Sequence, residues 1–435
     1  MKSILIIGVK ENCIMQDLTT EPSVLSITDE IRGKAAKGQY RISDVIYNKD
    51  GQEFQFVDLV MEGGGTLGIA LVGYIHALEQ ARVRFLGMGG SSVGAIVALL
   101  AYSCGDRLEA RGEKLASIIG GMNLGEMVDG NFVARKLSKL MGNKDTGLRR
   151  LRIVLYALVS FLTVYRKLGL NPGDELYRWI SDRLEENGIH TLADLNKLIK
   201  SMPDELVHRE TGEKIRNYDT SLRIVAADIT TSTKVVFPDM AEMYWQNPDE
   251  VNPASFARAS ASIPVFFQPF IVDGISNLIG NVEKWERLGS FSGTLPETVS
   301  FADGGLLSNF PIDLFKRIGV PRAPTLGAKL GNKNRSAQDV KKLCQYAKRL
   351  FNSLRHCADY DFIFKNPLYK QPVAHINTDD YNWLDFSMSH SDKVGLFRAG
   401  VSAGYEFLES FDWAKHKELR GAEVAAQHQQ SKIAT

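Results

Sequence analysis

Two short apolar runs, residues 57–61 and 83–88, stand at the centre of the hydrophobic pattern of this chain. Each has the length of a buried strand, and each ends in a glycine-rich turn. Between the two runs, apolar residues recur at the spacing of a helix, at Ile69, Val72, Ile75 and Leu78. A second apolar helix, residues 95–102, follows the second run. The pattern therefore predicts a β-α-β unit within a parallel sheet that is covered by helices.

The turn after the second strand contains the pattern G-x-S-x-G, from Gly90 to Gly94. Its frame selects Ser92, because Ser91 would need glycine at position 93 and the chain has Val93 there. Such a turn raises the central hydroxyl above the sheet edge. It also places that hydroxyl at a helix N-terminus, where developing negative charge is favoured. Ser92 is therefore the candidate nucleophile.

The glycine-rich loop at residues 63–68 opens the first helix and has its own chemistry. Acyl transfer creates an oxyanion, and preorganised backbone amides are its usual stabilisers. The amides of Gly63, Gly64 and Gly65 are the candidates, and Gly68 closes the loop. The alternative is a phosphate-binding loop, but the segment matches neither the P-loop pattern nor the dinucleotide-binding pattern.

An acidic residue, Asp303, follows the strand-like residues 299–302 and precedes Gly304 and Gly305. A carboxylate at the C-terminal edge of a strand lies where open α/β sheets place their sites. Asp303 is therefore the candidate base for Ser92. The alternative is a turn aspartate that binds its own backbone, for which Asp-Gly is typical.

Further elements follow from the same reasoning. Residues 222–229 predict another buried strand, which residues 235–237 can join, and Asp228 at its end is a rival to Asp303. Residues 253–270 predict a helix and then an aromatic run, which either packs in the core or walls an acyl-chain pocket. The remaining predictions are an amphipathic helix at 171–187, a strand at 325–329, helices at 341–351 and 393–408, and a frayed polar tail at 416–435.

Composition narrows the class of protein. A chain of 435 residues with 44% hydrophobic and 24% charged residues is typical of a soluble globular enzyme. The net charge of +1 argues against a nucleic-acid binder. The four cysteines have neither metal nor redox spacing and suit a reducing compartment. The apolar residues 4–9 are too few for a signal-peptide core, so we expect a cytoplasmic protein without a transmembrane helix.

A basic and apolar segment interrupts the alternation of strands and helices between residues 105 and 170. From 135 to 167 the chain has nine Lys or Arg against one acid, Asp145. The apolar run inside it, residues 153–165, is too short to span a bilayer. It predicts either a buried helix with a solvated basic rim or a cap that settles on anionic lipid.

Three motifs in this order resemble the patatin-like phospholipase family: the glycine-rich loop 63–68, the turn around Ser92 and the Asp303-Gly-Gly turn. Weaker similarity lies in residues 258–264, 309–311 and 383–411, so the resemblance covers most of the chain. It implies a three-layer α/β/α fold with a mainly parallel central sheet. The implied division is an N-terminal extension at 1–50, a catalytic domain at 51–415 with a cap insertion at 105–170, and a tail at 416–435.

The resemblance also implies a mechanism. Ser92 attacks a fatty acyl ester, Asp303 takes its proton without a histidine, and the glycine-loop amides hold the oxyanion. Gly90, Gly94, Gly304 and Gly305 support the two turns, and no metal or cofactor is implied. The implied partner is a phospholipid or another acyl lipid, reached by peripheral contact with a membrane. This chain departs from the family at Leu67, where the family usually has Arg or Lys.

Two alternatives stay open at this point. The order of residues also permits a Ser-Asp-His esterase or acyltransferase that uses His356, His375 or His390. Leu67 instead suggests a lipid-binding protein that kept the fold and lost turnover. The acyl length, the head group and the oligomeric state do not follow from the sequence.

Overall fold

The computed structural model describes residues 17–130, 135 and 164–434, apart from 204, 217, 318, 332–338 and 342. The apolar residues 4–9 lie outside the described residues, as do residues 131–134 and 136–163 of the predicted basic and apolar segment. The predictions made for them therefore stay predictions.

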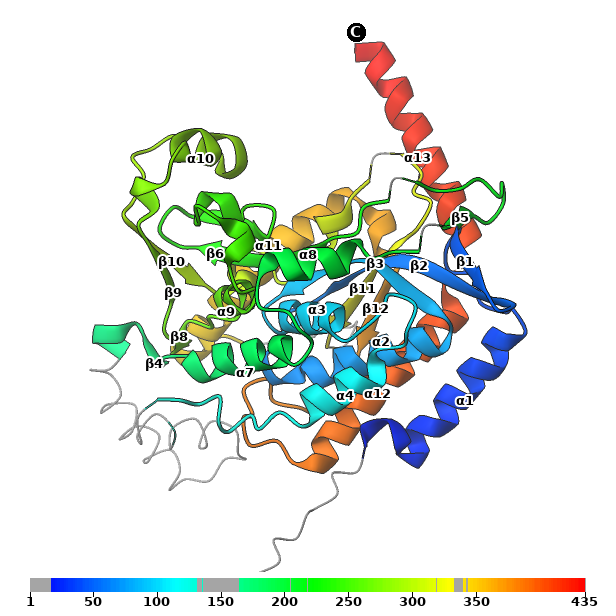
Figure 1. Ribbon diagram of the computed structural model, residues 1–435, viewed down its shortest axis with the longest axis horizontal. Helices are drawn as coiled ribbons and strands as arrows, with labels where there is room; N and C mark the ends of the chain where they lie inside the picture. Colours follow the sequence, from blue (N-terminus) through cyan, green and yellow to red (C-terminus); the bar gives the residue numbers. More distant parts are fainter. Residues whose placement is uncertain are drawn as a thin grey trace, which may run out of the picture.

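A ten-stranded sheet forms the centre of the molecule (Figure 1). Its parallel core has the order β12 (Val373–Ile376), β11 (Thr325–Leu330), β2 (Gln52–Met61), β3 (Val83–Ser91) and β6 (Leu222–Asp228). Antiparallel strands join this core: β1 (Val45–Lys49), β5 (Val207–His208), β7 (Thr233–Phe237), β9 (Phe270–Asp273) and β10 (Thr298–Ala302). The sheet is therefore mixed, and the prediction of a mainly parallel sheet needs correction, because an apolar run predicts a strand but not its direction.

Both faces of β2 are buried, which explains its continuous apolar run. Val57, Leu59 and Met61 belong to the main core together with the helices that cover this face. Phe56 and Val60 alternate with them and belong to two smaller cores on the opposite face. The strand thus separates two layers of the fold.

The helices on the first face lie close together. They are α1 (Pro22–Ala36), α2 (Gly68–Gln80), α3 (Val93–Ser103), α4 (Gly112–Gly120) and α12 (His390–Ser410). Glycine lets α2 and α12 approach each other: a Cβ on Gly73 would lie 2.1 Å from the carbonyl oxygen of Phe397. A Cβ on Gly400 would lie 1.9 Å from the carbonyl oxygen of Ala70. Substitution at either glycine therefore requires the two helices to separate.

The opposite face is covered by α11 (Leu343–Lys365) and by the segment with the short helices η6 (Gly304–Leu306) and η7 (Ile312–Phe315). Phe310 and Phe315 pack there against Val60 of β2. The fold therefore has three layers, as predicted. The main core on the first face also includes residues of α7 (Asp174–Glu185), α8 (Leu192–Lys200), α9 (Ala254–Ser260) and α10 (Asn281–Gly289). A separate two-stranded sheet is formed by β4 (Gly169–Asn171) and β8 (Val265–Phe267).

The tail is helical, so the prediction of a frayed tail is wrong. Helix α13 (Trp413–Ala434) leads away from the body of the molecule (Figure 1). Its first turns are anchored: Trp413 is buried, His416 contacts Gln371 at 2.9 Å, and Arg420 donates to the carbonyl of Gly319. These partners are distant in sequence, so the local polar composition did not predict the helix.

Candidate active site

Ser92 occupies a sharp turn between β3 and α3. Its backbone has φ 53° and ψ −123°, a conformation that is strained for a residue with a side chain. A Cβ on either flanking glycine, Gly90 or Gly94, would lie 2.5 Å from the carbonyl oxygen of Met61. The G-x-S-x-G pattern is therefore a steric requirement of this turn, and the serine hydroxyl stands at the N-terminus of α3.

The Ser92 hydroxyl donates a hydrogen bond of 2.6 Å to Oδ2 of Asp303. The other carboxylate oxygen of Asp303 accepts the Gly305 amide at 2.8 Å, so the predicted turn bond is present together with the contact to Ser92. The two side chains are 3% and 5% exposed. Burial raises the pKa of Asp303, while the Arg355 charge and the Ser92 hydrogen bond act in the opposite direction.

Asp303 reaches Ser92 by a route different from the one predicted. Strand β10 is antiparallel to β6, so it runs towards the carboxyl edge of the parallel strands from outside the sheet, and its C-terminal end stops at that edge beside Ala227. It pairs with only the last residues of β6, through Phe301 and Ala302, and therefore approaches from beyond that edge. The chain then turns over the sheet so closely that a Cβ on Gly304 would lie 2.0 Å from the carbonyl oxygen of Val225.

The C-terminal end of α9 and the turn that follows it support both residues of this pair. The Ser260 hydroxyl accepts the Ser92 amide at 2.9 Å and donates to the carbonyl of Val225 at 2.6 Å. The Asp303 amide donates to the carbonyl of Ser262 at 2.8 Å. The sequence analysis did not assign a role to Ser260; the only signal was its place in the weaker similarity at residues 258–264.

Arg258 holds this turn in place through its hydrogen bonds. Its buried guanidinium donates to the carbonyls of Pro172, Gly173 and Gln268 and to the Ser262 hydroxyl. Burial lowers the pKa of Arg258 to about 10, which still leaves it charged at neutral pH. The arginine thus ties the turn to the segment before α7.

The glycine-rich loop lies directly against the nucleophile. A Cβ on Gly63 would lie 3.1 Å from Cβ of Ser92, and one on Gly68 would lie 2.3 Å from Cγ2 of Val93. Leu67 is buried in the main core. The loop can therefore approach Ser92 only because these positions are glycine.

Three of the loop amides are already committed to acceptors. The amide of Gly63 donates to Asn309, that of Thr66 to Trp383, and that of Leu67 to Gly64. The amides of Gly64 and Gly65 have no acceptor within the described part of the chain. Of the three amides predicted to stabilise an oxyanion, those of Gly64 and Gly65 therefore remain candidates, because the Gly63 amide already has an acceptor.

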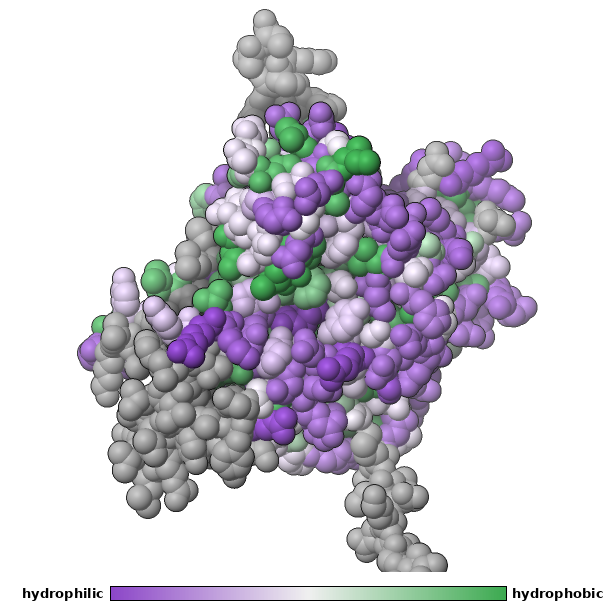
Figure 2. All heavy atoms as spheres, turned by 60° about the vertical axis from the view of Figure 1, so that its left-hand side comes forward, coloured by the Kyte–Doolittle hydropathy of each residue, from purple (hydrophilic) through white to green (hydrophobic). Residues whose placement is uncertain are grey.

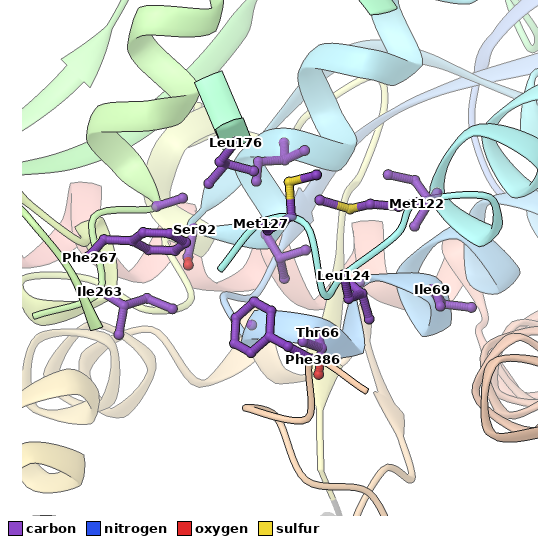
Figure 3. A pocket seen from close by; sticks show the side chains of 16 residues that line it. Thr66, Ile69, Ser92, Met122, Leu124, Met127, Leu176, Ile263, Phe267 and Phe386 are labelled. Carbon is purple, nitrogen blue, oxygen red and sulfur yellow. The ribbon is translucent and has the colours of Figure 1, made fainter. Parts of the chain in front are cut away.

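A narrow apolar cavity of about 60 Å³ opens beside Ser92. Figure 3 shows Ile263 and Phe267 close to Ser92, with Met122 on the far side. The aromatic run that follows α9 therefore contributes to the wall of a pocket as well as to the core. Methionine side chains at Met122 and Met127 can adapt their shape to a ligand.

The rival base, Asp228, has hydrogen-bond partners of its own. The carboxylate of Asp228 accepts hydrogen bonds from Thr230, Thr231 and Tyr244. The hydrogen bonds described for the Ser92 hydroxyl and the Asp303 carboxylate join them to each other and to Gly305, without a histidine. Within the described residues, no group of three or more His, Cys, Asp or Glu side chains is arranged to hold a metal ion.

Comparisons with known proteins show which family this chain belongs to. The family model for "Patatin-like phospholipase" matches residues 59–316. The chain is 28% identical over 360 residues to the uncharacterized protein YqhO of Bacillus subtilis (strain 168), which covers 82% of this chain and 100% of that protein. Among solved structures, VipD from Legionella pneumophila has a TM-score of 0.39 at 15% identity, covering 85% of this chain and 70% of that one. The complex of ExoU with SpcU from Pseudomonas aeruginosa has a TM-score of 0.34 at 17% identity, covering 87% and 60%. Since the family model spans more than half of the chain, this protein belongs to the patatin-like phospholipase family.

Proposed function

We propose that this protein is a lipid acyl hydrolase of the phospholipase A type that works through Ser92 and Asp303. The observation that carries the proposal is the buried 2.6 Å hydrogen bond from the Ser92 hydroxyl to the Asp303 carboxylate. A hydroxyl is a weak nucleophile until an adjacent base accepts its proton. Family membership supports a lipid hydrolase, and the apolar cavity beside Ser92 supports a fatty acyl substrate.

The proposed reaction has two halves. In the first, Ser92 Oγ attacks the ester carbonyl carbon while its proton passes to Asp303, and the carbonyl oxygen becomes an oxyanion. The amides of Gly64 and Gly65 stabilise this oxyanion. Asp303 then gives the proton to the leaving alcohol, and the acyl group stays on Ser92.

Hydrolysis of the acyl-enzyme repeats these steps with water. Asp303 removes a proton from water, the resulting hydroxide attacks the acyl carbonyl, and Ser92 leaves with the returned proton. The fatty acid is released and both residues regain their starting states. The raised pKa that burial gives Asp303 makes it a stronger base than an exposed carboxylate, provided that it stays ionised.

A lipid surface fits the side of the molecule that carries β8. Val265 is 57% exposed and lies in β8 between Ile263 and Phe267, which line the cavity. Leu168, beside β4, is also exposed, and β4 pairs with β8. Figure 2, which brings this side forward, shows apolar side chains among polar ones. The contact that we propose with the lipid surface is peripheral. No helix in the described ranges is long and apolar enough to cross a bilayer.

The test compares wild type with Ser92→Ala on a mixed lipid extract, with products identified by mass spectrometry. We expect fatty acids and lysolipids from wild type and none above background from Ser92→Ala. Ser103→Ala is the matched control, because this buried serine lies at the end of α3, away from Asp303. A serine-reactive phosphonate should label wild type and the control but not Ser92→Ala. Identical lipid profiles for wild type and Ser92→Ala would refute the hydrolase, and absent labelling of folded wild type would favour a non-catalytic lipid-binding protein.

A further inference from the structure

The glycine-rich loop, residues 63–68, contains no charged side chain, yet it lies against Ser92, whose hydroxyl is bonded to the buried carboxylate of Asp303. Burying an ionised carboxylate is costly unless a cation or several hydrogen bonds compensate it. A cation reaches this place from a distant part of the chain: Arg355, on α11. This residue lies beyond the range 59–316 that the family model matches.

Arg355 contacts the segments that surround the nucleophile. Its Nη2 atom donates to the carbonyl of Gly63 at 3.2 Å and to the side-chain oxygen of Asn309. Its guanidinium lies 5.6 Å from the ring centroid of Trp383, within the range of a cation–π contact. The carbonyl of Trp383 in turn accepts the amide of Thr66. One side chain therefore joins the glycine loop to the two segments that hold its amides.

The same guanidinium faces the carboxylate of Asp303. A Cβ built on Gly305 would lie 2.8 Å from Oδ1 of Asp303 and 3.3 Å from Nε of Arg355, so both groups border the same small space. The positive charge of Arg355 lowers the pKa of Asp303, against the larger effect of burial. The arginine thus favours the ionised form that a general base requires.

Helix α11 is held in place by contacts one turn after Arg355. Asp359 lies one turn further along, is 5% exposed, and accepts the Ser308 hydroxyl at 2.6 Å and the Phe310 amide at 2.7 Å. These two partners belong to the segment that follows the Asp303 turn. The docking of α11 on this segment therefore sets the place of the guanidinium.

We propose that Arg355 is a positioning residue of this active site, which holds the glycine loop in place and supplies the positive charge beside Asp303. The inference rests on the proposed function and deepens it, because it names a cation that the loop itself lacks. It also explains how the chain can have Leu67 in the loop and still present an ordered site.

Other charged groups nearby stay in place when Arg355 is replaced. Glu62 accepts the Asn309 amide at 3.1 Å, and Lys329 lies 3.8 Å from Glu62. Asp359 of α11 is a further charged group beside this segment, and Arg258 lies on the other side of the Asp303 turn, bonded to Ser262. Replacement of Arg355 therefore removes one positive charge but leaves Asn309 attached to Glu62.

The activity test uses Arg355→Met, Arg355→Lys and, as a matched control, Lys365→Met on the exposed side of the same helix. The pH dependence of kcat and KM is measured with a soluble short-chain ester. We expect Arg355→Met to lose about 10²-fold in kcat near neutral pH. The acid limb of its kcat/KM profile should move up by about 1–3 pH units, because Asp303 then protonates more easily.

Arg355→Lys should keep the acid limb close to that of wild type, because it keeps the charge. It should not restore the full kcat, because the ammonium of a shorter side chain cannot hold the contacts with Gly63, Asn309 and Trp383 together. Lys365→Met should match wild type in both measurements. An acid limb that stays unmoved in an active, folded Arg355→Met variant would overturn the inference.

A second measurement does not depend on activity. The melting temperature at neutral pH is compared for wild type, Arg355→Met, Asp303→Asn and the double variant. We expect the loss of Tm caused by Arg355→Met to be smaller in the Asp303→Asn background, because a neutral amide needs no cation. Equal losses in both backgrounds would refute the inference. An absence of Ser92-dependent hydrolysis in wild type would refute the proposed function instead, and the melting cycle would still decide the role of Arg355.

Discussion

The Ser260 hydroxyl offers a sharp test of how the strained nucleophile is held. Ser260→Ala removes the acceptor for the Ser92 amide, which then remains buried without a partner. A stranded buried amide costs about 1–3 kcal/mol. In domains of about half this length, 1 kcal/mol lowers Tm by about 2–4 °C, so we expect a loss of a few degrees and an intact fold.

The catalytic effect should exceed the effect on stability. The positive φ of Ser92 stores about 1–3 kcal/mol of backbone strain, and the bond from Ser260 opposes its release. A displacement of the hydroxyl by about 1 Å costs on the order of 10²-fold in rate, so we expect kcat to fall by about 10- to 100-fold. KM should stay unchanged, because Ser260 does not line the cavity.

The assay measures kcat and KM on a soluble ester, with Tm recorded by calorimetry on the same samples. Ser255→Ala is the matched control, since Ser255 is half-buried on the same helix and lies one turn before the supporting residue. A Ser260→Ala variant with a lowered Tm and a kcat within about twofold of wild type would refute the reasoning.

Three further predictions concern the base, the cavity and the glycine loop. Asp303→Asn should abolish hydrolysis and raise Tm at pH 7, because burial raises the pKa of Asp303 and its ionised form costs stability. This gain, followed by calorimetry, should vanish below about pH 4, where the free carboxyl is protonated in both states; a gain that persists in acid would contradict this assignment. Met122→Trp, at the far side of the cavity, should slow the hydrolysis of long-chain esters. The hydrolysis of short esters and the phosphonate labelling of Ser92 should stay near wild type. Equal slowing of long and short esters would place the acyl chain elsewhere. Gly63→Ala puts a methyl group 2.7 Å from Oδ1 of Asn309. We therefore expect kcat to fall by at least about tenfold and the fold to lose about 1–3 kcal/mol of stability. An unchanged kcat would show that the loop can move freely.

The sequence predicted the parts of the site that depend on local pattern. The strand, turn and helix around Ser92 follow from an apolar run, two glycines and a second apolar run, and all three lie where they were expected. The strand at 222–229 and its partner at 235–237 are also confirmed, as β6 and β7. Each of these predictions needed only residues that are neighbours in the chain.

What the sequence missed depends on partners that are far apart in the chain. The direction of β10 is set by its pairing with β6 and β9, which an apolar run does not encode. The Gly63 amide is occupied by Asn309, nearly 250 residues later, so the loop pattern could not exclude it from the oxyanion set. Ser260 and Arg355 make their contacts with segments distant in the chain, and a serine or an arginine on a helix has no local signature of such contacts.

The strand order has a consequence for synthesis of the protein. Strand β2 leaves the ribosome early, but its parallel neighbour β11 begins only at residue 325. At about 5–20 residues per second, the growing chain carries this apolar edge without its neighbour for roughly 10–50 s. Such an edge is a template for wrong pairing, and it makes the nascent chain a natural client for chaperones. A half-made molecule also lacks Asp303, so the base of the proposed reaction is absent until most of translation is complete.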